Sequence, residues 1–304
     1  MSSDSDLDHF DPDKRHDFTL FFDATNSNPN GDPNLDNLPR HDPDTGEGIA
    51  TGGSIKRKVR DWMIARGETV LVQPVDGSLQ DREIDLADKV DDTEDTEDSS
   101  DALTKHCIDV RLFGHVLTGE SDADSVWGPV QVCDAVSVHP VDIENMAITR
   151  VVRSSKEEGG GMGRRGVVRY GLYKAKGSYS PEKASKYVTE EDLQLLYEGL
   201  LRGFEHSASA ARPDVEGRKL LVVTHKHKLG NAPRSKTSEV LRSETNADHP
   251  RSIDDFDFVE EEAPDGTERR VFEPYDEALS PSEEETSEEE TSEEETSEEE
   301  TAES

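Results

Sequence analysis

Cysteine and long apolar stretches are both scarce in this sequence, which limits what the protein can be. Its 304 residues include two cysteines, Cys107 and Cys133, and neither belongs to a Cys-x-x-Cys pair. The sequence therefore predicts no disulfide framework and no zinc site, and we expect two small core residues in a reducing compartment. No run approaches the roughly 18 apolar residues of a membrane span. The Asp-rich N-terminus lacks a signal-peptide pattern, so we expect a cytoplasmic protein with no membrane partner.

Positive charge is also scarce, because 34 Lys and Arg face 70 Asp and Glu, for a net charge of −36. A nucleic-acid binder is usually basic, so the total charge argues against that class. The acid is concentrated at 280–304, with 13 Glu, and at 91–101, with seven acidic residues. Without both segments the charge is still −16. Such an acidic surface is typical of a halophile, since molar salt screens its repulsion; the alternative is an ordinary acidic protein with an acidic tail.

Mixed strand and helix patterns predict an α+β fold with an antiparallel sheet. We expect one strand at 17–23, with Phe18, Leu20 and Phe22 on one face, and one alternating strand at 127–138. In the latter, valines 130, 132, 136 and 138 would share a face. The remaining expected strands are 146–152, 167–175 and 219–225, and the expected helices are 54–65, 102–113 and 189–204, the last of them capped by Thr189 with Asp192.

Three polar segments complete the predicted organisation. Residues 1–16 form a polar leader, and 88–101 form an acidic disordered insert. From 243 to 304 the apolar density falls, and Ser-Glu-Glu-Glu-Thr repeats four times between 282 and 301. Such a composition cannot bury a core, so we expect a largely disordered tail. The palm of the fold would then lie between 17 and 242.

The helix at 54–65 carries the clearest binding signal. Ser54 is its expected N-cap, and four of the five positions from 56 to 60 are basic. Lys56 and Arg60 lie together on one flank of the apolar stripe, with Arg57 beyond them and Lys58 on the other flank. We interpret Lys56 and Arg60 as phosphate contacts that Arg57 and Lys58 could assist; the alternative is a solvated helix face.

A glycine-rich excursion at 153–166 is the second signal. Residues 150–176 hold eight basic and two acidic side chains, and five glycines at 159–161, 163 and 166 allow a ligand backbone to approach closely. Met162 could wedge against a base. The segment does not match a P-loop, and a mobile hairpin tip is the alternative.

Two further groups give weak signals for chemistry. His225 and His227 share a strand face, but no carboxylate or cysteine stands at a convincing spacing, so we predict no metal and a face toward solvent or RNA. Asp23 and Asp32 could suggest a carboxylate nuclease, although turn stabilisation is the better interpretation. We expect no catalytic residues and no cofactor.

An ordered set of short motifs resembles the CRISPR-associated Cascade backbone subunit of the type I-C branch, in the repeat-associated mysterious protein superfamily. The order and spacing hold from about 17 to 236. The matching segments are Asn28-Pro29-Asn30-Gly31-Asp32-Pro33, Leu38-Pro39-Arg40, Asp42–Gly46, Ile55–Arg60, Asp109–Gly114, Gly128–Gln131, Ile148–Arg150, Met162–Arg164, Tyr170–Tyr173, Phe204–His206, Ser209–Arg212 and Leu229–Pro233.

The resemblance implies a ferredoxin-like (RRM-like) palm with finger insertions and a thumb hairpin, the thumb being 153–166. It implies a non-catalytic subunit that polymerises along CRISPR RNA, with target DNA, copies of itself and other Cascade subunits as partners. Base pairing would read the sequence while the protein reads the backbone. The expected RNA-binding residues are Asn28, Asn30, Lys56, Arg57, Lys58, Arg60, Arg150, Met162, Gly163, Arg164, Arg165 and Arg169.

The acidic insert and the Glu-rich tail depart from the family pattern and look like halophilic additions. Two alternatives to the backbone role stay open. One is an RNA-processing endonuclease of the same superfamily that uses Asp23 or a histidine such as His206. The other is an acidic scaffold whose tail binds a basic partner.

Overall fold

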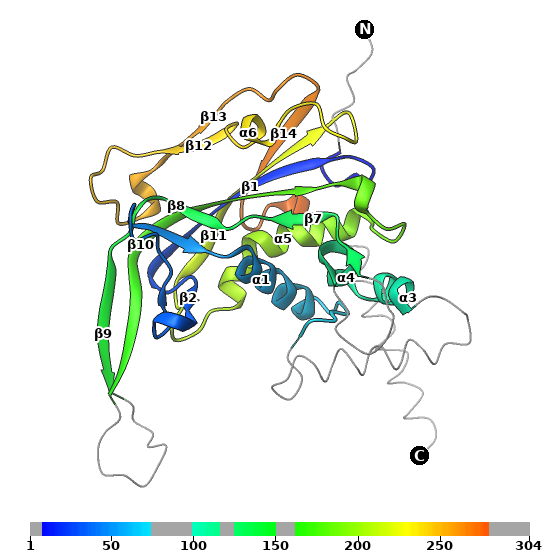
Figure 1. The fold of residues 1–304 in the computed structure, drawn as a ribbon. Helices are drawn as coiled ribbons and strands as arrows, with labels where there is room; N and C mark the ends of the chain where they lie inside the picture. Colours follow the sequence, from blue (N-terminus) through cyan, green and yellow to red (C-terminus); the bar gives the residue numbers. More distant parts are fainter. Residues whose placement is uncertain (1–7, 74–98, 116–124, 150–161, 280–304) are drawn as a thin grey trace, which may run out of the picture. The chain divides into compact units, whose positions relative to one another are not determined.

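The structure is a computed structural model that describes residues 8–73, 99–115, 125–149 and 162–279. The chain divides into two compact units, residues 1–274 and 275–304. The first unit is built on one large antiparallel sheet (Figure 1), and the second has one described element, η4 (Glu277–Leu279). Within the described residues, no helix is both long and apolar enough to cross a membrane.

The central strand of the sheet is β1 (His16–Ser27), and its residues are almost all buried. It pairs antiparallel with β10 (Met162–Tyr179) on one side and with β11 (Val215–His225) on the other. The full order is β14-β11-β1-β10-β8-β4, which adds β14 (Thr267–Phe272), β8 (Ala135–Pro140) and β4 (Glu47–Ala50).

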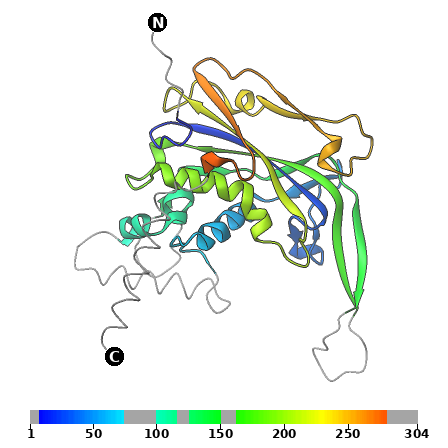
Figure 2. The ribbon, with the colours of Figure 1, turned by 180° about the vertical axis from the view of Figure 1, so that it is seen from behind.

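Two helices cover one face of this sheet, α1 (Gly52–Ala65) and α5 (Glu190–His206), and Figures 1 and 2 show them side by side. Phe22 of β1 lies between the helix layer and the strand beside it. Its ring stacks on Phe204 of α5 at 4.4 Å between centroids and on Tyr173 of β10 at 5.1 Å. This apolar layer fixes α5 against the middle of the sheet, and α1 packs beside α5.

The opposite face is covered by the segment between β11 and β14, shown yellow to orange in Figure 1. This segment carries α6 (Arg234–Thr237), β12 (Leu241–Glu244), η3 (Ile253–Asp255) and β13 (Asp257–Glu260). Its Val240, Leu241 and Phe256 pack against Phe21 and neighbouring strand residues in a second core. The sheet is therefore buried on both faces at its centre, which explains why β1 lacks an exposed edge or face.

β10 is longer than the sheet it joins, and its first part forms a two-stranded arm with β9 (Ile143–Thr149). The register runs from Met162 opposite Thr149 to Val168 opposite Ile143. From Val168 onward β10 pairs with β1. One strand thus carries the arm directly out of the central sheet (Figure 1).

Short elements fill the connections. They are β2 (Gly31–Asp32), η1 (Pro33–Leu35), β3 (Leu38–Pro39), α3 (Ser99–His106), α4 (Ile108–Phe113), β5 (Gly114–His115), β6 (Val126–Trp127), β7 (Val130–Val132) and η2 (Pro181–Lys183).

The strand at 17–23 and the helix at 189–204 are confirmed, including the capping box of Thr189 and Asp192. The N-cap of α1 is Thr51 rather than Ser54, because the Thr51 hydroxyl accepts from the Ser54 amide at 3.2 Å. The predicted helix 102–113 is two helices, since Cys107 between them has extended backbone angles.

The predicted single strand 127–138 is wrong. Three short strands replace it, because the chain leaves strand conformation at residues 128–129 and again at 133–134. Val130 is buried, whereas Val136 and Val138 are 40% and 37% exposed. The valines therefore do not share one face.

The acidic tail begins later than we predicted, because residues 243–274 belong to the first unit and supply β13 and β14. The insert also ends earlier, since 99–101 form the first turn of α3; residues 88–98 lie outside the described residues. The leader is not simply polar. Phe10 lies 5.7 Å from the Phe272 ring and 5.8 Å from Tyr197, which anchors residues 8–16 to the core.

Close packing of α1 on α5 depends on Gly203. A Cβ at this position would lie 2.6 Å from the backbone oxygen of Lys58, which cannot move away without shifting α1. We predict that Gly203→Ala lowers the free energy of unfolding by about 1–3 kcal/mol, although alanine favours helix. Gly53→Ala is the matched control, because its Cβ would meet nothing closer than 4.0 Å. Urea unfolding in molar KCl measures both, and equal midpoints would contradict the prediction.

Candidate nucleic-acid interface

The end of β1 leads into a polar loop that connects three parts of the first unit. The Asn28 amide donates to the Ala211 carbonyl at 2.9 Å, which ties the loop to the connection between α5 and β11. The Asn30 side-chain oxygen accepts from the Thr51 amide at 3.0 Å, which ties the loop to the N-cap of α1. Asn28 and Asn30, both predicted from the sequence, therefore hold the region together through their own hydrogen bonds.

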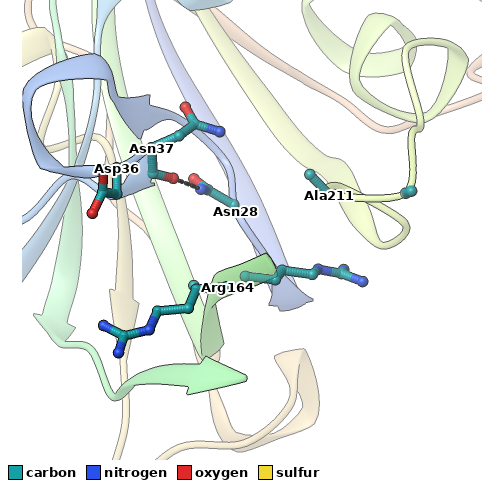
Figure 3. A pocket seen from close by; sticks show the side chains of 8 residues that line it. Asn28, Asp36, Asn37, Arg164 and Ala211 are labelled. Carbon is teal, nitrogen blue, oxygen red and sulfur yellow. Dashed lines mark hydrogen bonds between the residues drawn. The ribbon is translucent and has the colours of Figure 1, made fainter. Parts of the chain in front are cut away.

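A pocket of about 280 Å³ opens beside this loop (Figure 3). Asn28, Asp36 and Asn37 form one wall, and Arg164 and Arg165 of β10 contribute another. Gly166, Ala210 and Ala211 complete the lining. The fold thus joins the end of β1, the arm and the α5–β11 connection, which are far apart in the sequence, around one small cavity.

Backbone conformation on this wall is unusual. Asp36 and Asn37 have φ values of 52° and 60°, and Asn26 near the end of β1 has 46°. Side-chain-bearing residues rarely adopt this left-handed region, although Asn and Asp tolerate it best. The turn is held by the Asn37 amide, which donates to the Asp32 carbonyl at 2.8 Å. Such local strain is typical of binding sites.

The arm places its predicted residues in different settings. Arg164 is exposed and lines the pocket, and Arg165 also reaches the Asn26 carbonyl at 3.5 Å. Arg169 pairs with Glu144 at 2.5 Å, so a carboxylate already neutralises it. Met162 and Gly163 lie in β10 at the far end of the described arm, so this part of the predicted excursion is strand. Arg150 lies outside the described residues.

Two of the four basic residues of α1 have carboxylate partners. Arg57 donates to Asp61 at 2.6 Å. The Arg60 Nε donates to Asp109 at 2.8 Å, and the same buried carboxylate accepts from the amides of Leu71 and Val72. Asp109 is fully buried, so the Arg60 pair anchors the residues after α1 to α4. Their predicted role in binding RNA stays a prediction.

The other two, Lys56 and Lys58, have no carboxylate partner among the described residues. The Lys56 ammonium lies 5.1 Å from the centre of the Phe113 ring, a cation–π contact, and burial followed by the Arg60 charge lowers its pKa. Lys58 is only 8% exposed. Burial, followed by the charge of Arg212, lowers the pKa of Lys58 to about 8. A buried lysine beside an arginine is costly unless an anion joins them.

Arg212 is the residue that the sequence reasoning missed as a binding candidate. It belongs to the Ser209–Arg212 motif, and it follows Ala211 on the rim of the pocket. Its Nε is buried and has no hydrogen-bond partner among the described residues. The motif was the available signal, but nothing in the sequence places it beside α1. Arg164, which lines the pocket, and Arg212, which follows Ala211 of its lining, are both cations without a carboxylate partner among the described residues.

The residues considered for catalysis or metal binding make contacts within the fold. Asp23 is buried and accepts from Arg218 at 2.8 Å and from the Tyr170 hydroxyl at 3.2 Å, and burial raises its pKa. His206 makes an edge contact with Trp62 at 5.6 Å. The expectation that His225 faces solvent or RNA is wrong, because it is fully buried and lies 3.2 Å from Asp17. No three His, Cys, Asp or Glu side chains in the described ranges form a metal-binding group.

The lowered pKa of Lys58 predicts a stability change on removing its charge. The folded protein binds this proton less tightly than the unfolded chain, so the penalty is fully present below pH 8 and disappears as the pH rises toward 10.5. We predict that Lys58→Met stabilises the free protein by about 1–3 kcal/mol at pH 7. Lys226→Met, at an exposed lysine, is the control. Unfolding curves from pH 7 to 10.5 measure the free energy of unfolding of both variants and the wild type. If the stabilisation by Lys58→Met does not become smaller above pH 8, the prediction is contradicted.

Comparison with solved structures gives two matches with TM-scores below 0.5. One chain of "CRISPR RNA-guided surveillance complex, pre-nicking" has 16% identity and a TM-score of 0.46, covering 74% of this chain and 80% of the other. A chain of "CRISPR RNA-guided surveillance complex" has 15% identity and a TM-score of 0.43, covering 77% and 78%.

Sequence comparison identifies the family. The protein described as "CRISPR-associated protein Cas7" in Haloferax volcanii is 31% identical over 150 residues, which are 42% of this chain and 44% of that protein. The match thus spans less than half the length of this relative. The family described as CRISPR-associated protein Cas7 matches residues 14–260, most of the chain. This chain therefore belongs to the CRISPR-associated protein Cas7 family.

Proposed function

We propose that this protein is an RNA-binding backbone subunit of a CRISPR surveillance complex and carries the guide along which target DNA is recognised. The observation that carries the proposal is the pocket of Asn28, which Arg164 and Arg165 line and whose Ala211 is followed in the chain by Arg212. Neither Arg164 nor Arg212 has a carboxylate partner among the described residues, and the Arg212 Nε has no hydrogen-bond partner there. In a chain with 70 acidic residues, cations kept from carboxylates are available to an anionic ligand. The regularly spaced anions of an RNA backbone fit this arrangement.

The fold supports the proposal of an RRM-like, ferredoxin-like palm. The elements β1, α1, β8, β10, α5 and β11 follow one another along the chain, and the four strands have the sheet order β11-β1-β10-β8. Both helices lie on the same face of the sheet (Figures 1 and 2). The β9–β10 arm corresponds to the base of a thumb hairpin. Its expected tip, residues 150–161, lies outside the described residues.

Further parts of the proposal rest on the family and on composition. We propose a type I-C complex in which copies of this chain assemble along CRISPR RNA with other Cascade subunits, in the cytoplasm. The relative from Haloferax volcanii and the acidic composition support a halophilic source. In molar salt, phosphate contacts weaken, so stacking and close backbone contacts would supply more of the affinity.

We propose a non-catalytic role for the chain itself. Asp23, the carboxylate considered for an endonuclease, is buried and bound to Arg218 and Tyr170. Those contacts occupy both of its oxygens, which leaves it poorly placed to act on RNA. Among the described residues, no contact of Asp23 or His206 favours the endonuclease alternative.

Charge removal at the pocket tests the proposal. We predict that Arg164→Gln with Arg212→Gln weakens RNA binding and reduces the slope of log K against log salt by about 0.7 for each lost phosphate contact. Arg269→Gln is the matched control, because that arginine already pairs with Glu260. Fluorescence anisotropy with a labelled single-stranded RNA between 0.5 and 2 M KCl measures both. If the double variant keeps the wild-type slope of log K against log salt and the wild-type unfolding midpoint, the pocket is not the RNA site.

A further inference from the structure

Asn28 holds an unused hydrogen-bond acceptor at the pocket. The residue is 4% exposed, and its Nδ2 donates to the Asn37 carbonyl at 2.7 Å (Figure 3). A carbonyl only accepts, so the amide nitrogen must face Asn37 and the Oδ1 must face away. That oxygen is buried and has no hydrogen-bond partner among the described residues. Leaving a buried acceptor unpaired is unfavourable, and a ligand that donates to it would remove the penalty.

The free atom restricts the chemistry of the ligand. An acceptor cannot bind a phosphate oxygen, which also only accepts, so Asn28 needs a hydroxyl or amino donor. The opposite wall carries Arg164 and Arg165, which suit the phosphate of the same molecule. The pocket holds about 280 Å³, just below the usual range of about 300–1,000 Å³ for small-molecule sites. A single nucleoside with its phosphate at the rim matches both the size and the arrangement of polar groups.

Two donors of a nucleotide could reach Asn28, the ribose 2′-hydroxyl and an exocyclic amine of the base. A guide-carrying subunit must accept every guide sequence, and uracil has no exocyclic amine. The 2′-hydroxyl is present on every ribonucleotide and is absent from DNA. Resting on the proposed function, we propose that Asn28 Oδ1 accepts a hydrogen bond from a ribose 2′-hydroxyl and thereby selects RNA over DNA.

The surrounding turn is suited to such a contact. Asp36 and Asn37 are exposed and left-handed, and the Asn37 carbonyl fixes the Asn28 amide. Because the Asn28 oxygen has almost no accessible surface in the free chain, this turn must shift to admit the hydroxyl. Gly166, Ala210 and Ala211, which also line the pocket, have no side chain or only a methyl group, so they leave room for the sugar.

Oligouridine tests the inference, because its bases carry no amine. The full chain in 1 M KCl is titrated into labelled 30-nucleotide strands with ribose, 2′-deoxyribose or 2′-O-methylribose. We expect the ribose strand to bind about 2- to 12-fold more tightly than both others, the effect of one hydrogen bond. In Asn28→Leu the ratio should fall close to one. The ratio compares strands on the same protein, so a general loss of affinity cancels.

Asn34→Leu is the control, since Asn34 is exposed on the same loop and does not line the pocket. It should keep the wild-type ratio. Equal binding of ribose and deoxyribose strands by the wild type, or an unchanged ratio in Asn28→Leu, would overturn the inference. An Asn28-dependent preference for oligodeoxycytidine over oligodeoxyuridine would assign the contact to a base amine and overturn the ribose assignment. Binding of no oligonucleotide would overturn the proposed function and this inference with it.

Discussion

The pairing of β1 with β10 is the interaction on which the rest of the structure depends. It runs from His16 opposite Tyr179 to Ser27 opposite Val168, and it is buried under helices on one face and the 231–262 segment on the other. At the end of this ladder β1 turns away at Asn28, while β10 continues into the arm with Arg164 and Arg165. The pocket therefore lies where the two strands separate. One wall, Arg164 and Arg165, belongs to β10 itself, and the other starts at Asn28, directly after β1 ends.

The distribution of charge is the second constraint. Three of the basic residues of α1 and β10 are paired with carboxylates, Arg57 with Asp61, Arg60 with Asp109 and Arg169 with Glu144. Lys58 is different because it is buried without a carboxylate partner among the described residues, and burial, followed by the charge of Arg212, lowers its pKa at a cost to the folded state. Retaining such a lysine in a halophile-like composition makes sense if an anion compensates for the cost when bound. Paired arginines then support the scaffold, and the cations without described carboxylate partners are left for the ligand.

Local sequence patterns predicted where helices and strands lie, but they did not predict which residues those elements pack against. The apolar periodicity of 189–204 and the alternation of 17–23 each lie within one element, so they could be read directly. The break at Cys107 and the change of face after Val132 depend on tertiary packing. Helical spacing placed Lys58 on one flank of the apolar stripe, where we expected it to assist phosphate binding. Because Gly203 lets α5 approach α1 closely, this flank is covered and Lys58 is buried. The unpaired oxygen of Asn28 depends on the distant Asn37 and Ala211, which no local pattern reveals.

Guide RNA bound to this Cas7-family chain can be detected without any added substrate. The chain is purified from its native host in molar potassium chloride, and the nucleic acid bound to it is extracted and sequenced. We expect short RNAs of uniform length that carry CRISPR spacer sequence. Recovery of RNA of mixed length and cellular origin, or of no RNA from a complex that is otherwise intact, would contradict it.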